Sequence, residues 1–168
     1  MSAARPFGFA LGANLDSPRD AIAAALERLA RRFGPLEVAP LYRSEPVSPI
    51  PQPEYLNTVA LGHGPQEPEE LLAGALAVEA ELGRRRDLPL GPRRIDLDLL
   101  FVGDLERDAP GLRLPHPRLR ERRFVLAPLA DLVPDLALPP DGRRVGDLLA
   151  ALPGGPWVKR LRSEDPCC

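Results

Sequence analysis

The chain has 168 residues, a formal net charge of −2 and 44% hydrophobic residues, which is typical of one globular domain with a real core. The small net charge gives no general electrostatic reason to expect nucleic-acid binding. No apolar run approaches the roughly 20 residues of a membrane span, and the two cysteines, Cys167 and Cys168, are adjacent and cannot form a disulfide framework. We therefore expect a cytoplasmic protein with no membrane and no nucleic-acid partner. A monomer is expected as well, although none of these features determines the oligomeric state.

Segments of regular structure are predicted in the order strand, helix, strand, strand, helix, strand. They cover residues 7–11, 18–33, 36–43, 55–61, 68–82 and 95–102. The helices show apolar residues at helical spacing, a proline in the first turn and a glycine after the last. Four prolines between residues 44 and 54 predict an irregular loop. The order indicates an α+β fold with a ferredoxin-like βαββαβ core, in which an antiparallel sheet carries both helices on one face.

Beyond residue 103 the pattern is weaker. We expect a short strand at residues 112–114, a helix at 124–132 and a terminal helix at 145–152, the helices forming a C-terminal extension of the core. Residues 1–160 are predicted to form a single domain and residues 161–168 a flexible tail.

Two acidic residues, Asp96 and Asp98, carry the strongest chemical signal. Along a strand the side chains alternate, so Ile95, Leu97, Leu99 and Phe101 should face one way and both aspartates the other, with their Cα atoms roughly 7 Å apart. Two carboxylates on one rigid face repel each other unless a cation lies between them, and Mg²⁺ commonly combines carboxylates with substrate phosphates. The alternative is a solvated polar strand face without any metal.

Arginines precede the acidic pair in two groups, Arg84 to Arg86 and Arg93 with Arg94. A site for a metal-bound triphosphate needs both signs of charge, so this cluster favours the metal interpretation. Arg84 to Arg86 follow a predicted helix, where they could instead complement the helix dipole.

Other candidate residues suit a flat heterocycle. Tyr55 and Asn57 are two apart on one strand and share a face, which places an amide beside a ring, and Phe124 could supply a second ring. His116 lies in a stiff turn between prolines and could donate to a phosphate. Each of these residues could also be an ordinary core or surface residue. Gly12 and Asn14, in the turn after the first strand, are a weak signal because any tight turn favours such residues.

Several motifs occur in an order that resembles the 6-hydroxymethyl-7,8-dihydropterin pyrophosphokinase family of folate biosynthesis. They are Leu11-Gly12-Ala13-Asn14-Leu15, Tyr42-Arg43-Ser44-Glu45-Pro46-Val47, Gln52-Pro53-Glu54-Tyr55-Leu56-Asn57, Gly83-Arg84-Arg85-Arg86, Gly91-Pro92-Arg93-Arg94-Ile95-Asp96-Leu97-Asp98, and Pro115-His116 followed by Arg122 and Phe124. The resemblance spans roughly residues 7–134. It implies a ferredoxin-like enzyme that transfers diphosphate from ATP to the hydroxymethyl group of the pterin and releases AMP.

The resemblance also implies a role for each matching residue. Asp96 and Asp98 would hold a pair of Mg²⁺ ions and act in catalysis with Arg84, Arg86 and Arg93. The residues implied for binding ATP are Glu79, Arg84, Arg86, Arg93, Leu99, His116 and Arg122. Those implied for binding the pterin are Ser44, Val47, Tyr55, Asn57, Asp96 and Phe124.

The sequence departs from the family pattern at Leu90, where a Trp is frequent, at Ala13, where a Ser is frequent, and beyond Gly142, where the match is poor. Two alternatives stay open. One is another Mg²⁺-nucleotide-dependent transferase, and the other is a non-catalytic ferredoxin-like module that binds a ligand or RNA.

Overall fold

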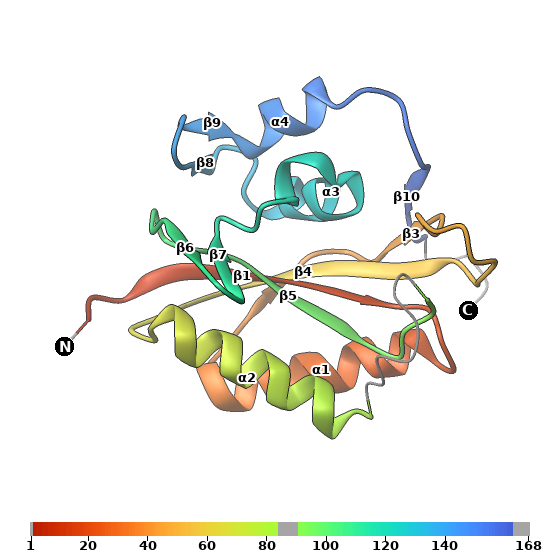
Figure 1. Ribbon diagram of the computed structural model, residues 1–168, viewed down its shortest axis with the longest axis horizontal. Coiled ribbons are helices and arrows are strands. Elements are labelled where there is room, and N and C mark those ends of the chain that lie inside the picture. The colour runs from red at the N-terminus through yellow and green to blue at the C-terminus, as the bar shows by residue number, and fades with distance from the viewer. Residues whose placement is uncertain (1, 84–90, 163–168) are drawn as a thin grey trace.

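The computed structural model describes residues 2–83 and 91–162 of the chain. In this part of the protein a six-stranded antiparallel sheet forms the middle layer, with the strand order β10-β3-β4-β1-β5 and β2 paired to β4 (Figure 1). Its strands are β1 (Arg5–Ala13), β2 (Glu37–Val38), β3 (Tyr42–Ser44), β4 (Tyr55–Gly64), β5 (Asp96–Val102) and β10 (Val158–Arg160). The fold is therefore a mixed α and β fold built on an antiparallel sheet.

The helices lie on both faces of this sheet. Helices α1 (Pro18–Phe33) and α2 (Pro68–Glu81) cover one face, while α3 (Arg123–Leu132) and α4 (Val145–Ala151) lie over the other (Figure 1). The remaining elements are β6 (Arg107–Ala109), β7 (Leu112–Leu114), the short helix η1 (Leu119–Glu121), β8 (Ala137–Leu138) and β9 (Arg143–Arg144). Among the helices of the described residues, none combines the length and apolar character needed to cross a membrane.

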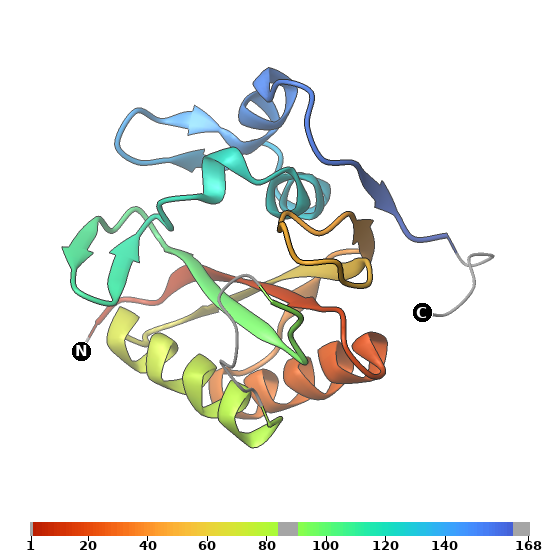
Figure 2. The ribbon, with the colours of Figure 1, turned by 45° about the vertical axis from the view of Figure 1, so that its right-hand side comes forward.

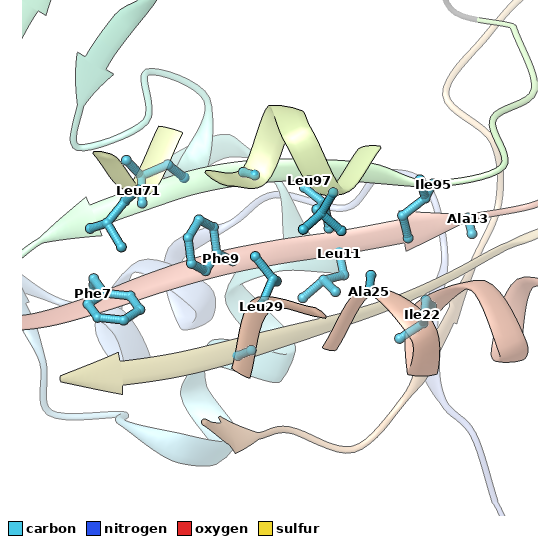
Figure 3. Close-up of a cluster of buried hydrophobic side chains, with 14 of the residues drawn as sticks. Phe7, Phe9, Leu11, Ala13, Ile22, Ala25, Leu29, Leu71, Ile95 and Leu97 are labelled. Atoms are coloured by element: carbon cyan, nitrogen blue, oxygen red, sulfur yellow. The ribbon is translucent and has the colours of Figure 1, made fainter. Parts of the chain in front are cut away.

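The main core lies between the sheet and helices α1 and α2. Phe7, Phe9 and Leu11 of β1 alternate toward it and are almost fully buried, and they meet Leu29 of α1 and Leu71 of α2 (Figure 3). Burying one such side chain stabilises the fold by about 1.5–3 kcal/mol. This packing against α1 and α2 fixes the position of the central strand β1. It therefore also fixes the residues on the opposite face of that strand.

A second cluster lies on that opposite face. Val59 of β4 and Leu100 of β5 pack against Leu126 and Leu129 of α3, with Val145 of α4 behind them. This cluster covers only part of the sheet. Next to Ala10 of this cluster, the same face of β1 carries Gly12, which has no side chain and leaves room above the sheet.

Most predicted elements match observed ones within one to three residues at each end, and the exception is the predicted strand at residues 36–43. It is wrong as a single strand, because the structure has two short strands, β2 and β3, in its place. Pro40 lies between them, and a proline cannot donate the hydrogen bond that a continuous strand would need there. Strands β6, β8, β9 and β10 and the short helix η1 were not among the predicted elements.

The predicted alternation along the last core strand holds for Leu97 and Leu99 but is wrong for Phe101. The register between β1 and β5 shifts between Gly8 and Phe9, so Leu100 forms a bulge, and Phe101 joins Leu100 in the cluster on the α3 side. An extra residue in one strand reverses the faces of the residues that follow it. The bulge lies after Asp98 and leaves the acidic pair on the predicted face.

Candidate active site

A cavity of about 470 Å³ opens on the sheet face that α3 leaves uncovered. Its floor is the central strand β1, at Ala10 and Gly12. Gly12 pairs with Asn57 of β4 on one side and with Asp96 of β5 on the other. Neighbouring strands are about 4.8 Å apart, so Asn57 and Asp96 are separated by roughly 10 Å across the floor.

Glycine leaves space at position 12, since a Cβ there would lie 3.2 Å from Oδ1 of Asn57, closer than an ordinary contact. A larger side chain would push this amide out of place and fill the cavity between Asn57 and Asp96. The floor is therefore flat between an amide on one side and a carboxylate on the other.

The acidic end of the cavity contains the predicted pair. Asp96 and Asp98 both line the cavity, and each already contacts a cation. Nη1 of Arg93 lies 3.1 Å from Oδ1 of Asp96, and Nη1 of Arg122 lies 3.4 Å from Oδ2 of Asp98. The acidic and basic residues that the sequence separates by up to 29 positions thus meet in one place.

His116 lies beside Asp98, with its Nε2 atom 3.9 Å from Oδ1 of the Asp98 carboxylate. Burial lowers the pKa of His116 below its usual value, and the nearby Asp98 opposes this shift. The backbone N–H of Arg118 donates to Nδ1 at 3.2 Å, which assigns the remaining ring proton of the neutral form to Nε2. Neutral His116 therefore directs an N–H donor toward Asp98, although His116 itself is not among the residues that line the cavity.

Arg122 lies between the acidic end and an aromatic ring. Its guanidinium carbon is 5.6 Å from the ring centre of Phe124, a distance typical of a cation–π contact. Burial lowers the pKa of Arg122 from its ordinary value, although the group stays charged near neutral pH. In the described part of the chain, the buried Nε of Arg122 has no hydrogen-bond partner.

The opposite end of the cavity suits a heterocycle. Nδ2 of Asn57 donates to Oγ of Ser44 at 2.7 Å, and both residues are at most 4% exposed. Tyr55 also lines the cavity, and its hydroxyl donates to the carbonyl of Gly91 at 3.3 Å. Phe124 and Val47 line the cavity as well, and Val47 is 55% exposed.

Not every predicted site residue lines this cavity. Glu79 is buried in α2 and Leu99 is buried in the main core, on the other side of the sheet. Arg84 and Arg86 lie outside the described residues, as do Arg85 and Leu90. The nucleotide contacts assigned to these residues stay predictions.

Asn14 is a residue whose importance the sequence did not reveal. Its buried side chain donates from Nδ2 to Oε1 of Gln52 and to the carbonyl of Pro53, both at 2.9 Å, and it accepts at Oδ1 from the backbone N–H of Arg93 at 2.8 Å. One amide thus joins the end of β1 to the proline-rich loop and to the segment that leads into Asp96. Only the fold could show this, because the contacts to Arg93 span 79 positions.

Replacing Asn14 with Ala is expected to lower the free energy of unfolding by about 1–3 kcal/mol, because it leaves buried donors and acceptors unpaired. Urea unfolding of the variant and of wild type measures this change. Gln52→Ala removes only one of the three partners and should have a smaller effect. Equal stability of Asn14→Ala and wild type would show that the bridging amide does not hold these loops together.

Further residues of the cavity wall were also missed. Arg118 lines it, and so do residues 152–156 and Val158, which follow α4. The motifs end well before this segment, so no sequence signal placed it near the acidic pair.

The acidic side chains of the cavity can also be compared with the ligand sets that different metal ions need. Among residues 2–83 and 91–162 no group of three or more His, Cys, Asp or Glu side chains converges. A site made by the protein alone for zinc or calcium would need more ligands than one pair of carboxylates. Mg²⁺ often takes one or two carboxylates and completes its octahedron with phosphate oxygens and water, so the donors present fit Mg²⁺ bound together with a nucleotide.

Comparison with known proteins agrees with this geometry. Residues 8–134 match the sequence model of the family described as 7,8-dihydro-6-hydroxymethylpterin-pyrophosphokinase (HPPK). The 2-amino-4-hydroxy-6-hydroxymethyldihydropteridine pyrophosphokinase of Pseudomonas aeruginosa is 48% identical over 146 residues, which are 86% of this chain and 90% of that protein. The protein of the same name from Synechocystis is 39% identical over 142 residues, covering 83% and 72% of the two chains.

Among solved structures, the wild-type HPPK-DHPS protein of Plasmodium falciparum with pteroate aligns with a TM-score of 0.70 at 12% identity, which shows a shared fold. The alignment covers 89% of this chain and 42% of that longer chain. The extent of the family match and the identity to the bacterial relatives confirm the family predicted from the motifs. This chain therefore belongs to the 7,8-dihydro-6-hydroxymethylpterin-pyrophosphokinase family and is an enzyme.

Proposed function

We propose that this enzyme transfers the β,γ-diphosphate of ATP to the hydroxymethyl oxygen of 6-hydroxymethyl-7,8-dihydropterin and releases AMP, as a step of folate biosynthesis. The observation that carries this proposal is the row Asn57, Gly12 and Asp96 across the cavity floor. It sets a hydrogen-bonding amide at one end of a flat surface and a carboxylate at the other. A planar ring on Gly12 would then direct a substituent toward the acidic pair.

The residues at the first end would bind the pterin ring. Tyr55 and Phe124 both line the cavity and would enclose the ring by stacking, while Asn57, held by Ser44, would bind its polar edge. Because Asn57 and Ser44 are buried and already hydrogen-bonded to each other, the amide is oriented before the substrate arrives. Such preorganisation lowers the entropic cost of binding.

The residues at the second end would bind the triphosphate. Asp96 and Asp98 would hold Mg²⁺, in a pair of ions by our prediction, and bound Mg²⁺ would neutralise phosphate charge. Arg93 and Arg122 lie beside these carboxylates and can contact phosphate oxygens, and the Nε2–H of His116 supplies a neutral donor. Phosphoryl transfer depends mainly on such positioning and charge stabilisation, and no general base is required of any side chain here.

We also infer that the core is the ferredoxin-like arrangement. The strand order β3-β4-β1-β5 supports this inference, since each of β1 and β4 lies between strands antiparallel to it, and both crossover helices, α1 and α2, cover one face. The helices α3 and α4 would then be the predicted C-terminal extension. The domain limits, the monomeric state, the cytoplasmic location and the absence of a nucleic-acid partner stay predictions.

The proposed reaction is tested by measuring AMP release from Mg-ATP with and without the hydroxymethyl pterin. Pterin-dependent AMP formation is expected. AMP formation that does not require the pterin would instead favour another Mg²⁺-nucleotide-dependent transferase. The non-catalytic RNA-binding alternative is not favoured, because the exposed sheet face carries two carboxylates that would repel phosphate in the absence of metal.

Phe124→Ala is expected to weaken pterin binding about fivefold or more, because a stacking partner worth roughly 1 kcal/mol is lost. Isothermal titration with the pterin, in the presence of an unreactive ATP analogue and Mg²⁺, measures this affinity. Phe124→Leu keeps apolar contact without an aromatic face and should retain part of it. Unchanged pterin affinity in both variants would contradict the stacking role.

A further inference from the structure

The segment of residues 152–158, here called the C-terminal strap, forms a wall of the cavity that no motif accounts for. Residues 152–156 and Val158 line the cavity beside Ser44, Val47 and Phe124. The family match ends at residue 134, so the strap lies outside it. In Figures 1 and 2 the chain leaves α4, passes α3 and descends to β10 beside β3, which is the side of the sheet where the proline-rich loop begins.

The first end of the strap is held by Arg123. Its Nη2 donates to the carbonyls of Leu152 and Pro153, each at 3.2 Å. Arg123 is the first residue of α3 and precedes Phe124, the proposed stacking residue, so the guanidinium joins the strap to the helix end that carries this ring.

The second end is held by the sheet. Val158 pairs with Ser44 in the antiparallel ladder of β10 and β3, and the backbone N–H of Glu45 donates to the carbonyl of Trp157 at 3.2 Å. Arg160 adds an ion pair to Asp131 of α3. The strap is therefore bonded directly to the segment that carries Ser44 and Val47.

Between these anchors the strap contains the short segment Pro153-Gly154-Gly155-Pro156. Pro153 and Pro156 restrict the backbone, and they flank Gly154 and Gly155, where an added Cβ would meet no atom within 4 Å. The strap contains no charged side chain, so its contribution to the cavity is a neutral wall of backbone and apolar groups. Such a wall is compatible with a neutral heterocycle and adds no positive charge that would attract a phosphate.

We propose that the C-terminal strap, positioned by Arg123, is the outer wall of the heterocycle end of the cavity and sets the affinity for the ring-bearing substrate, without taking part in diphosphate transfer. This inference rests on the proposed pterin site. It assigns Arg123 as a positioning residue, in contrast to its neighbour Arg122, which would contact phosphate.

The test compares equilibrium binding and steady-state kinetics of full-length variants. Arg123→Ala should raise the Kd and KM for the pterin about tenfold, because two hydrogen bonds from a charged donor are lost and the wall loosens. The kcat and the affinity for an unreactive ATP analogue with Mg²⁺ should stay within about twofold of wild type. Arg123→Lys keeps the charge and one donor group and should recover most of the pterin affinity.

A matched control is Arg113→Ala, which removes an exposed arginine of the β6–β7 hairpin and should change neither affinity. If Arg123→Ala does not fold, a variant with two glycines inserted between Gly154 and Gly155 keeps every anchor and only slackens the strap. It should show the same loss of pterin affinity, since exposed loops tolerate insertions.

Pterin affinity within twofold of wild type in both the Arg123 and the insertion variants would overturn the inference. So would an equal loss of ATP-analogue and pterin affinity, which would show that Arg123 supports the whole cavity and not the heterocycle end in particular. These outcomes are distinct from failure of the proposed function, in which the wild-type protein itself would not bind the hydroxymethyl pterin.

Discussion

Asp98→Ala should lower kcat by about 10³-fold or more, by analogy with the removal of other groups that stabilise developing charge in a transition state. The carboxylate is held on the cavity side of β5 by strand alternation and lies beside both Arg122 and His116. Its loss would remove a proposed magnesium ligand and the acceptor of the hydrogen bond from Nη1 of Arg122. Steady-state measurement of AMP release at saturating ATP and pterin reports the change.

The isosteric variant Asp98→Asn separates charge from packing, because it keeps the shape of the side chain and removes its negative charge. It should lose nearly as much turnover as the alanine variant and melt close to the wild-type temperature. In wild type Mg²⁺ should strengthen ATP binding, and this effect should shrink in Asp98→Asn. Asp108→Ala, in the exposed β6–β7 hairpin, is the matched control. Near-normal turnover of Asp98→Asn would reject the proposed metal role.

Arg122→Ala should lower kcat/KM by about 10²-fold, because it removes a partly buried guanidinium from beside the acidic pair. The geometry favours a substrate contact for this residue. Its Nε is buried with no partner among the described residues, and a buried donor left unpaired costs about 1–3 kcal/mol, which an incoming phosphate oxygen would recover.

The same geometry predicts little change in folding stability. The ion pair between Arg122 and Asp98 is partly exposed, and pairs of this kind contribute about 0–1 kcal/mol. Thermal melting of Arg122→Ala should therefore stay near wild type while activity falls, and Arg122→Lys should recover only part of it, since an ammonium lacks the planar fork of the guanidinium. A variant that loses stability and keeps its activity would make Arg122 a structural residue.

The sequence predicted this site to an unusual extent, because its strongest features are local. Strand alternation alone puts Asp96 and Asp98 on one face and Leu97 and Leu99 on the other, and the structure agrees. The same rule predicted that Tyr55 and Asn57 share a face, and both line the cavity. The rule failed at Phe101, where a bulge shifts the register, because a bulge depends on pairing with β1.

Other features of the fold and the site could not be predicted from local sequence patterns. Pro40 was visible in the sequence, yet only the paired strands show that it divides residues 36–43 into β2 and β3. Asn14 looked like an ordinary turn residue until the fold placed its amide against Gln52, Pro53 and Arg93. The family resemblance implies a nucleotide contact for Leu99, and the structure shows that its side chain is buried in the main core.

Local sequence patterns were enough to predict the family, the order of the core elements and the acidic pair with its arginines. These properties are encoded in spacing over a few residues, where backbone geometry fixes the direction of each side chain. The paths of distant segments were needed to show that Asn14 joins the end of β1 to Pro53 and Arg93, and that the C-terminal strap forms part of the cavity wall. Contacts between residues 29 to 79 positions apart depend on the path of the whole chain, so the periodicity of a short segment cannot predict them.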